Sequence, residues 1–214
     1  AEIGRFSSVP IRAQLPSAAR SVALGGNYGC AILEQPQDNQ GNGLIWCWGE
    51  NDFGQHGIGN NYAIEIETLG STTITRRADG TLWGWGLARS GHLGTGFYSG
   101  APHYDNDAQV EPLRVGICQG RGNCTGDLPV IESIFTDSSK VCARTQAKQF
   151  YCWGGNNRSN ELGRCVDNCH SGRTDNTKVP DFVLSAEDQV PQTGEEIAGS
   201  YGVGCIRRAD GTVV

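Results

Sequence analysis

The chain has 214 residues and a net charge of −6, a length that suits one large or two small domains. It contains 31 glycines, 8 prolines and no methionine, and only 19% of its residues are charged, which favours short strands joined by turns over helices. It carries neither the clustered basic tract that nucleic-acid binders use nor a run of about 18 apolar residues, so we expect no nucleic-acid partner and no membrane insertion.

A first sequence element recurs four times along the chain. Each copy starts with an aliphatic residue, runs through small or polar residues and ends in a short strand-like stretch. The copies are residues 22–32 (VALGGNYGCAI), 66–76 (IETLGSTTITR), 134–144 (IFTDSSKVCAR) and 197–207 (IAGSYGVGCIR). This recurrence indicates an internal repeat, which has to be recognised before a fold class is assigned.

Two further elements accompany the first. An aromatic-x-Trp-Gly frame that ends near a glycine occurs at residues 44–59 (LIWCWGENDFGQHGIG), 81–96 (TLWGWGLARSGHLGTG) and 149–164 (QFYCWGGNNRSNELGR). A Pro-x-x-Val or Pro-x-x-Ala motif occurs at residues 10–13, 112–115 and 180–183. The three elements together define one repeating unit.

The repeat divides the chain into four units, approximately 1–53, 54–90, 91–159 and 160–214, within a single domain of residues 1–214. A unit of about 40 to 50 residues with a Trp-Gly signature is typical of propeller blades, and the later units carry insertions. The abundance of glycine and β-branched residues excludes helical solenoids. We therefore predict an all-β fold, a β-propeller.

The cysteines provide a test of this register. Asp-Gly at residues 79–80 predicts a hairpin that places Ile74 opposite Gly84. In the other units the same two positions hold cysteines, Cys30 with Cys47 and Cys142 with Cys152. Because cysteine is present at both positions or at neither, we predict two disulfides between neighbouring strands.

The remaining cysteines complete the pairing. The segments CQGRGNC and CVDNC would close two small disulfide loops, Cys118 with Cys124 and Cys165 with Cys169. Cys205 is then the unpaired cysteine of nine. So many paired cysteines favour an oxidising compartment, so we expect an extracellular, cell-surface or periplasmic protein.

The phase of the repeat at the two ends predicts a segment of a longer array. The expected partner of Cys205 would follow Val214, and residues 1–5 (AEIGR) match residues 160–164 (NELGR) from the middle of a unit. The alternative is a complete short protein whose last blade closes in another way.

The elements VALGGNYGCAI, WCWGENDFGQHGIG and LWGWGLARSGHLGTG resemble the regulator of chromosome condensation repeat over nearly the entire chain. That family's pattern runs V-A-x-G-x-x-H-x-x-A-L and then W-x-W-G-x-N-x-x-G-Q-L-G-x-G. The Cys-Ala and Cys-Trp-Gly variants here look like those of exported bacterial members. The third unit departs from the pattern because it lacks the glycine of the first element.

The resemblance implies a propeller of four-stranded blades, usually seven, so that about four units would form part of a seven-bladed or longer array. Alternate residues of a strand lie on one face, where tryptophans can pack between adjacent blades. The tryptophans assigned to this packing are Trp46, Trp48, Trp83, Trp85 and Trp153.

Several polar motifs raise the possibility of a ligand site. Asp105, Asn106 and Asp107 offer oxygen ligands for calcium, but their spacing is not that of an EF-hand, so a solvated insertion is favoured. Residues 165–170 (CVDNCH) could contribute to a zinc site, although a small disulfide loop is favoured there. His56 and His92 have no visible metal partner, so a structural role in turns is favoured for both.

We expect no metal and no other cofactor, and the motifs of common hydrolases and nucleotide-binding folds are missing from the sequence. Asn123 and Asn157 fit the N-x-[ST] pattern for glycosylation, which matters only in a eukaryotic secretory pathway.

Three functions follow as hypotheses. The first is a non-enzymatic extracellular scaffold that binds another protein or a surface glycan through its rim loops, with residues 97–127 as the best candidate. The second is a structural section of a larger cell-surface or filament-forming protein, with self-association through an incomplete blade. The third, a lyase or hydrolase in a central channel, has no supporting residue constellation.

Overall fold

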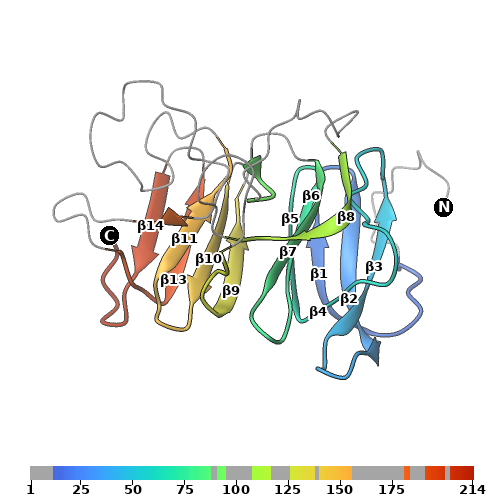
Figure 1. Cartoon of the computed structure of the whole chain (residues 1–214), viewed down its shortest axis with the longest axis horizontal. Helices are drawn as coiled ribbons and strands as arrows, with labels where there is room; N and C mark the ends of the chain where they lie inside the picture. Colours follow the sequence, from blue (N-terminus) through green and yellow to red (C-terminus); the bar gives the residue numbers. More distant parts are fainter. Residues whose placement is uncertain are drawn as a thin grey trace.

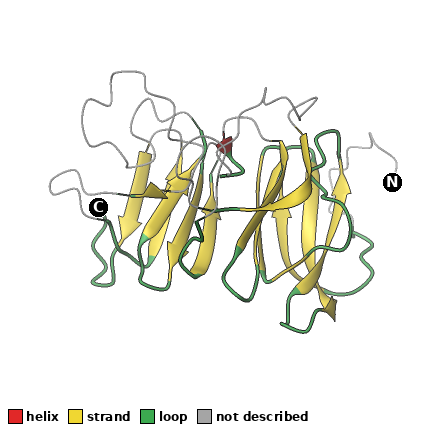
Figure 2. Ribbon diagram, viewed as in Figure 1, coloured by secondary structure: helices red, strands yellow, loops and turns green. Residues whose placement is uncertain are grey.

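The computed structural model describes residues 12–87, 91–94, 108–116, 126–137, 140–155, 181–183, 191–200 and 203–214. These residues form three four-stranded sheets and one two-stranded sheet, all antiparallel. Figure 2 shows that strands account for most of the regular structure. The predicted all-β fold with four-stranded sheets is confirmed.

The first sheet follows chain order, with each strand paired to the next. Its strands are β1 (Ala19–Leu24), β2 (Tyr28–Gln37), β3 (Gly43–Gly49) and β4 (Tyr62–Ala63). The second sheet repeats this order with β5 (Glu65–Leu69), β6 (Thr72–Arg76), β7 (Leu82–Leu87) and β8 (Ala108–Arg114). Short turns between successive strands produce this meander.

The third sheet contains β9 (Ile131–Thr136), β10 (Val141–Thr145), β11 (Phe150–Trp153) and β12 (Asp181–Phe182), again in chain order. The last sheet pairs β13 (Glu196–Ser200) with β14 (Val203–Arg207). After β14 the chain turns back, so that Ile206 and Val214 exchange two backbone hydrogen bonds. This fourth group of strands therefore begins like the other three.

The sheets stand side by side in sequence order, from the first at the right of Figure 1 to the last at the left. Strands β1 and β2 contact β5, and β5 and β6 contact β9, so each sheet packs on the next. Three apolar cores fill the junctions, and each draws residues from two successive sheets. Stacked layers that bury their faces only against neighbours are typical of repeat architectures.

The sheets are offset from the sequence units by one strand. The unit of residues 54–90 begins with β4, which completes the first sheet, and only then enters the second sheet at β5. In the same way, β8 and β12 belong to units that begin after their own sheets have started. The outer strand of each sheet is thus supplied by the next repeat of the sequence.

One hairpin turn occurs twice with the same sequence, ADGT at residues 78–81 and 209–212. In each copy an aspartate carboxylate, of Asp79 or Asp210, accepts hydrogen bonds from the backbone N–H and the hydroxyl of the threonine two residues later. Gly80 adopts a φ of 80°, and a Cβ there would lie 2.5 Å from the Val130 side chain. Glycine is therefore required at this turn.

The two disulfides between neighbouring strands that the sequence predicted are present. Cys30 pairs with Cys47 across β2 and β3, and Cys142 pairs with Cys152 across β10 and β11. In the second sheet the equivalent positions also face each other, as Ile74 and Gly84. A Cβ on Gly84 would lie 2.8 Å from the Ile74 Cδ1 atom, so the isoleucine occupies the space that the disulfide fills elsewhere.

Other predictions about cysteine fall partly outside the described residues. Cys118, Cys124, Cys165 and Cys169 all lie there, as do the glycosylation candidates Asn123 and Asn157. Cys205 lies on β14, where it is exposed and free. In the part of the chain that the structure describes, no helix is long and apolar enough to cross a membrane.

Replacing Cys142 and Cys152 together by alanine should lower the free energy of unfolding by about 3 kcal/mol, because the bridge restricts the unfolded chain. Chemical unfolding without reductant measures this change. The control is Cys205→Ala, which removes an exposed, free thiol and should change stability by less than about 0.5 kcal/mol. Equal effects of the two changes would contradict the assigned role of the disulfide.

Candidate functional site

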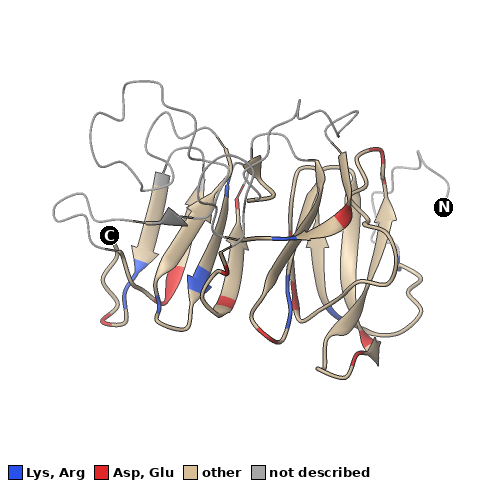
Figure 3. Ribbon diagram, viewed as in Figure 1, with Lys and Arg blue, Asp and Glu red and all other residues tan. Residues whose placement is uncertain are grey.

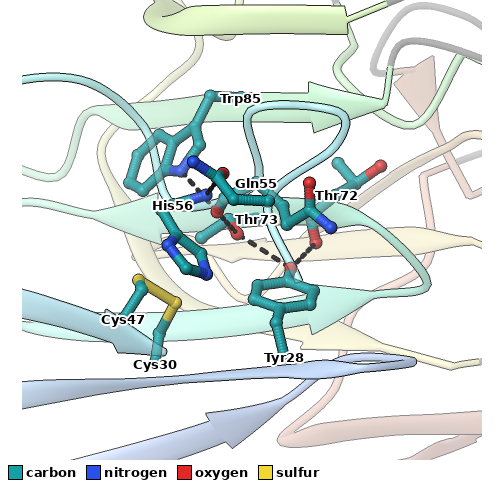
Figure 4. The surroundings of a disulfide bond; sticks show 9 residues. Tyr28, Cys30, Cys47, Gln55, His56, Thr72, Thr73 and Trp85 are labelled. Atoms are coloured by element: carbon teal, nitrogen blue, oxygen red, sulfur yellow. Dashed lines mark hydrogen bonds between the residues drawn. A yellow bond between two sulfur atoms is a disulfide. The ribbon is translucent and has the colours of Figure 1, made fainter. Parts of the chain in front are cut away.

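The junction between the first and second sheets holds a connected group of polar side chains (Figure 4). The Tyr28 hydroxyl donates to the Thr72 carbonyl at 2.7 Å and lies 2.8 Å from the Thr73 hydroxyl. The Thr73 hydroxyl in turn lies within hydrogen-bonding distance, 2.8 Å, of the Gln55 carbonyl. These contacts join β2, β6 and the loop after β3.

Burial raises the pKa of Tyr28, and the contact with the Thr73 hydroxyl only partly opposes this effect. The phenol is therefore neutral and serves as a hydrogen-bonding group. A Cβ at Gly25 would overlap the Tyr28 ring, so the ring lies directly over this glycine. The glycine thus allows the tyrosine to reach the next sheet.

Tryptophan indoles make the same contact at two junctions. Trp85 donates from Nε1 to the Gln55 carbonyl at 2.9 Å, and Trp153 donates to the His92 carbonyl at 2.8 Å. Gln55 and His92 occupy equivalent positions in the G-Q-H-G and G-H-L-G loops. Each tryptophan therefore buries its ring on the preceding sheet while its N–H satisfies a loop carbonyl.

His56 lies beside this group, close to the Cys30–Cys47 disulfide in Figure 4. Its backbone N–H donates to the Asn51 side chain, and its half-buried ring is 6.2 Å from the Tyr28 ring. Burial lowers the pKa of His56, while the Trp48 and Glu50 carbonyls act in the opposite direction. These contacts are those of a residue with a structural role in the turn.

The junction between the second and third sheets is held by two glutamates of β5. Glu65 accepts from the Ile134 N–H and pairs with Arg76, whose Nε lies 2.6 Å from the carboxylate. Glu67 accepts from the Thr136 hydroxyl at 2.9 Å. Burial raises the pKa of Glu67; the Thr136 hydrogen bond opposes the rise and the Glu65 charge adds to it.

The third junction contains a buried ion pair that the sequence analysis did not identify. The Lys140 Nζ atom lies 2.6 Å from the Asp137 carboxylate, and the two side chains are 5% and 10% exposed. Lys140 aligns with Tyr28 and Thr72 at the start of the second strand of each sheet. This alignment could have predicted the burial of Lys140, because side chains at this position face a neighbouring sheet.

Charged residues of both signs also lie on and beside β9, β10 and β13, where Figure 3 colours the ribbon blue and red. Arg144 contacts Glu132 on one side and Glu195 on the other, and Lys148 lies near the same two carboxylates. Both glutamates are partly exposed, so solvent screens each pair and each contributes little to stability. This network joins the third sheet to the segment that leads into β13.

The predicted tryptophans occupy different environments. Trp85 and Trp153 are almost fully buried, and Trp83 packs partly on the first core, with the Arg77 guanidinium 4.1 Å from its ring centroid. Trp46 and Trp48 lie on one face of β3, as the strand alternation predicts. Trp46 is 43% exposed, however, so no described residue packs it between two sheets. For Trp46 and Trp48, packing between adjacent blades stays a prediction, because no sheet of the described residues lies on that side of β3.

The calcium candidates Asp105, Asn106 and Asp107 lie outside the described residues, and so does the zinc alternative at residues 165–170. The rim insertion at residues 97–127 is described only at 108–116, which contains β8, and at 126–127. Across the described ranges, no group of three or more His, Cys, Asp or Glu could hold a metal ion.

No protein-family model matches the chain. Among solved structures, human WBSCR16 aligns with a TM-score of 0.54 and 16% identity, over 78% of this chain and 38% of that one. Prp20p from Saccharomyces cerevisiae aligns at 0.53 and 17%, over 79% and 39%. Yeast RCC1 (Prp20) bound to Kap60 aligns at 0.55 and 17%, over 90% of this chain and 42% of that one.

These alignments show an RCC1-like propeller fold. At such identity they carry the fold alone, and fold does not determine function. The chain spans no more than 42% of the length of these three structures. It is therefore an RCC1-like, disulfide-bonded propeller fragment in structural terms.

Tyr28→Phe should lower the free energy of unfolding by about 1 to 2 kcal/mol, because it removes the hydroxyl that reaches the second sheet. Denaturant titration measures the loss. Tyr62→Phe is the matched control, since the Tyr62 hydroxyl makes no hydrogen bond among the described residues. A loss at Tyr62 as large as that at Tyr28 would contradict the assignment.

Glu67→Gln should raise the melting temperature at pH 7, and the advantage should vanish near pH 4. A carboxyl group whose pKa is raised by folding favours the folded state fully below its unfolded value, near 4.5, and loses this contribution as pH rises through the folded pKa. Glutamine keeps an oxygen that accepts from Thr136. Melting curves between pH 4 and 8 test this, with Glu65→Gln expected to destabilise at pH 7 through loss of the Arg76 pair.

Proposed function

We propose that this chain is part of a non-enzymatic, exported RCC1-like propeller that binds another protein or a surface glycan through its rim. The observation that carries the proposal is the presence of a disulfide inside each of two blades, the first and the third, of an RCC1-like fold. Disulfides persist in oxidising compartments, which supports an extracellular, cell-surface or periplasmic location. The Cys-Trp-Gly variants support the exported bacterial type.

The chemistry of the buried polar groups supports a scaffold rather than a catalyst. Tyr28 and Glu67, whose pKa values are raised by burial, each hydrogen bond across a junction between sheets. Lys140 is paired with Asp137 at a third junction. Tyr28 and Glu67 thus hold one sheet on the next, and the charge of Lys140 is compensated within its own sheet.

Protein binding is the general precedent for this fold, since RCC1-like propellers bind proteins and yeast RCC1 was solved bound to Kap60. In this chain the insertion at residues 97–127 is the proposed recognition region. Its strand β8 forms the outer edge of the second sheet and exposes Val110 at 42%. Exposed edge strands and the loops beside them are common sites of recognition.

A second candidate function is a structural section of a larger cell-surface or filament-forming protein. The specific observation in its favour is the apolar face of the first sheet, where Val22 and Leu24 are 54% and 72% exposed. Apolar side chains gathered on one sheet face mark an interaction surface.

A matched pair of valine variants tests the first candidate. Biotinylated chain is offered to a glycan array and to photo-crosslinking on intact cells, and the Kd for each captured glycan or protein is then measured. Val110→Asp should weaken binding about tenfold or more, because a charge at a contact centre costs at least 1.4 kcal/mol. Val130→Asp, at a site 48% exposed and outside the insertion, should leave the Kd within about twofold.

Equal Kd values for the two variants would rule out the insertion as the recognition region. Turnover in a panel of lyase and hydrolase substrates would overturn the non-enzymatic proposal. Melting curves of both variants establish that a change in Kd is not a loss of folding.

A further inference from the structure

The loop after β3 places a histidine at a position that is apolar in the next repeat. Residues 54–57 (GQHG) and 91–94 (GHLG) form the same turn, in which the last glycine N–H donates to the first glycine carbonyl, at 2.8 and 3.0 Å. All four glycines have a φ between 64° and 72°. Leu93, the third residue of the second turn, is 2% exposed and belongs to an apolar core. His56 therefore occupies the position at which the next repeat buries a leucine.

The surroundings of the His56 ring favour its neutral form. The ring is half-buried, lies 6.2 Å from the Tyr28 ring and is close to the disulfide of the first sheet in Figure 4. Its Nε2 atom is buried and makes no hydrogen bond with any described residue. The Trp48 and Glu50 carbonyls favour the charged form, but burial outweighs them and lowers the pKa of His56. Protonation therefore places a charge where the fold compensates it poorly.

The groups that face His56 offer no ion pair to the charged ring. Strand β2 contributes the neutral Tyr28 phenol, and the loop of His56 itself carries the carboxylates of Glu50 and Asp52. The Glu50 carboxylate accepts from the Asn27 amide at 2.8 Å. Among the residues that the structure describes, no carboxylate pairs with His56. On β6 and β7 the residues labelled around the ring in Figure 4 are all uncharged: Thr72, Thr73 and Trp85.

The residue before His56 holds the second sheet. The Gln55 carbonyl accepts from the Trp85 indole N–H at 2.9 Å and from the Thr73 hydroxyl at 2.8 Å. Gln55 is 1% exposed, and its side-chain oxygen accepts from the Phe53 N–H at 2.9 Å. Because Gln55 and His56 are adjacent in one tight turn, a movement of the ring out of its buried position displaces this carbonyl.

From this arrangement we infer that His56 is an acid-sensitive switch of the first junction. Protonation of the ring releases the loop of residues 51–59 from the second sheet and breaks the hydrogen bonds to the Gln55 carbonyl. The second junction lacks this switch, because its equivalent turn carries Leu93. The switch does not depend on the partner proposed above.

The direction of the pH effect follows from the pKa of His56, which folding lowers from 6.5. A histidine of this kind contributes stability that is complete above pH 6.5. The contribution is lost as pH falls from 6.5 toward the folded pKa, because the open loop binds the proton more readily than the closed loop. Mild acid therefore favours the open loop.

Hydrogen exchange at the tryptophan indoles, followed by NMR, tests the inference. The parent is His92→Gln, which removes the imidazole of the second turn and gives it the residue of the first. Exchange at Trp85 relative to Trp153 should rise severalfold from pH 7.5 to pH 5, with a limit of about 30-fold for a reference pKa of 6.5. Trp153 is the internal control, since its indole makes the same hydrogen bond beside Leu93.

Two variants of the parent isolate the imidazole. His56→Leu copies the second turn, and His56→Gln keeps a polar side chain without a titratable group. In each of them the ratio of Trp85 to Trp153 exchange should no longer rise in acid through His56. The glutamine variant is sufficient by itself if the leucine variant does not fold.

Three results would overturn the switch. The first is a ratio of Trp85 to Trp153 exchange that stays constant from pH 7.5 to pH 5 in the parent. The second is a rise of equal size in His56→Gln. The third is a His56 pKa at or above 6.5 in an NMR titration of the ring. None of them bears on the recognition role of residues 97–127, which the valine variants test separately.

Discussion

The structure depends on the burial of one sheet face against the next. No four-stranded sheet in this chain has a closed core of its own, because each apolar core takes residues from two successive sheets. The hydrogen bonds between sheets follow the same logic: tryptophan N–H groups, the Tyr28 hydroxyl and the β5 glutamates all bind backbone or hydroxyl groups of a neighbour. Stability is therefore a property of junctions rather than of single sheets.

The junctions between sheets repeat along the chain, although the residues that form them differ from one sheet to the next. The disulfide of the first and third sheets gives way in the second to Ile74 above Gly84, which fills the same space. Tyr28, Thr72 and Lys140 occupy equivalent positions in the three sheets. Tyr28 and Thr72 hydrogen bond to different carbonyl groups, and Lys140 forms an ion pair. What repeats is the direction of the side chain and the need to satisfy a polar group at the boundary.

The sequence was informative wherever a local rule fixes geometry. The Asp-Gly turn sets the hairpin register, and the register places Cys142 opposite Cys152, so the disulfides and the four-stranded meander could be predicted. The exposure of Trp46 could not, because a strand pattern defines which face a residue lies on but not whether another sheet covers that face. The burial of the Lys140–Asp137 pair could not be predicted for a related reason: the pair lies against Ile197 and Ala198 of the next sheet, far along the chain.

Both described disulfides tie neighbouring strands of one sheet, while the three junctions between sheets hold by packing and hydrogen bonds. Under tension along the chain, such a molecule yields at its junctions before its bridged hairpins can open. Each disulfide also prevents the residues that it encloses from extending under force. The bonded cysteines are 17 residues apart in the first sheet and 10 residues apart in the third. A protein built this way can lose contact between its sheets and regain it, while the disulfide-bonded hairpins keep the strand register from which the sheets pack again.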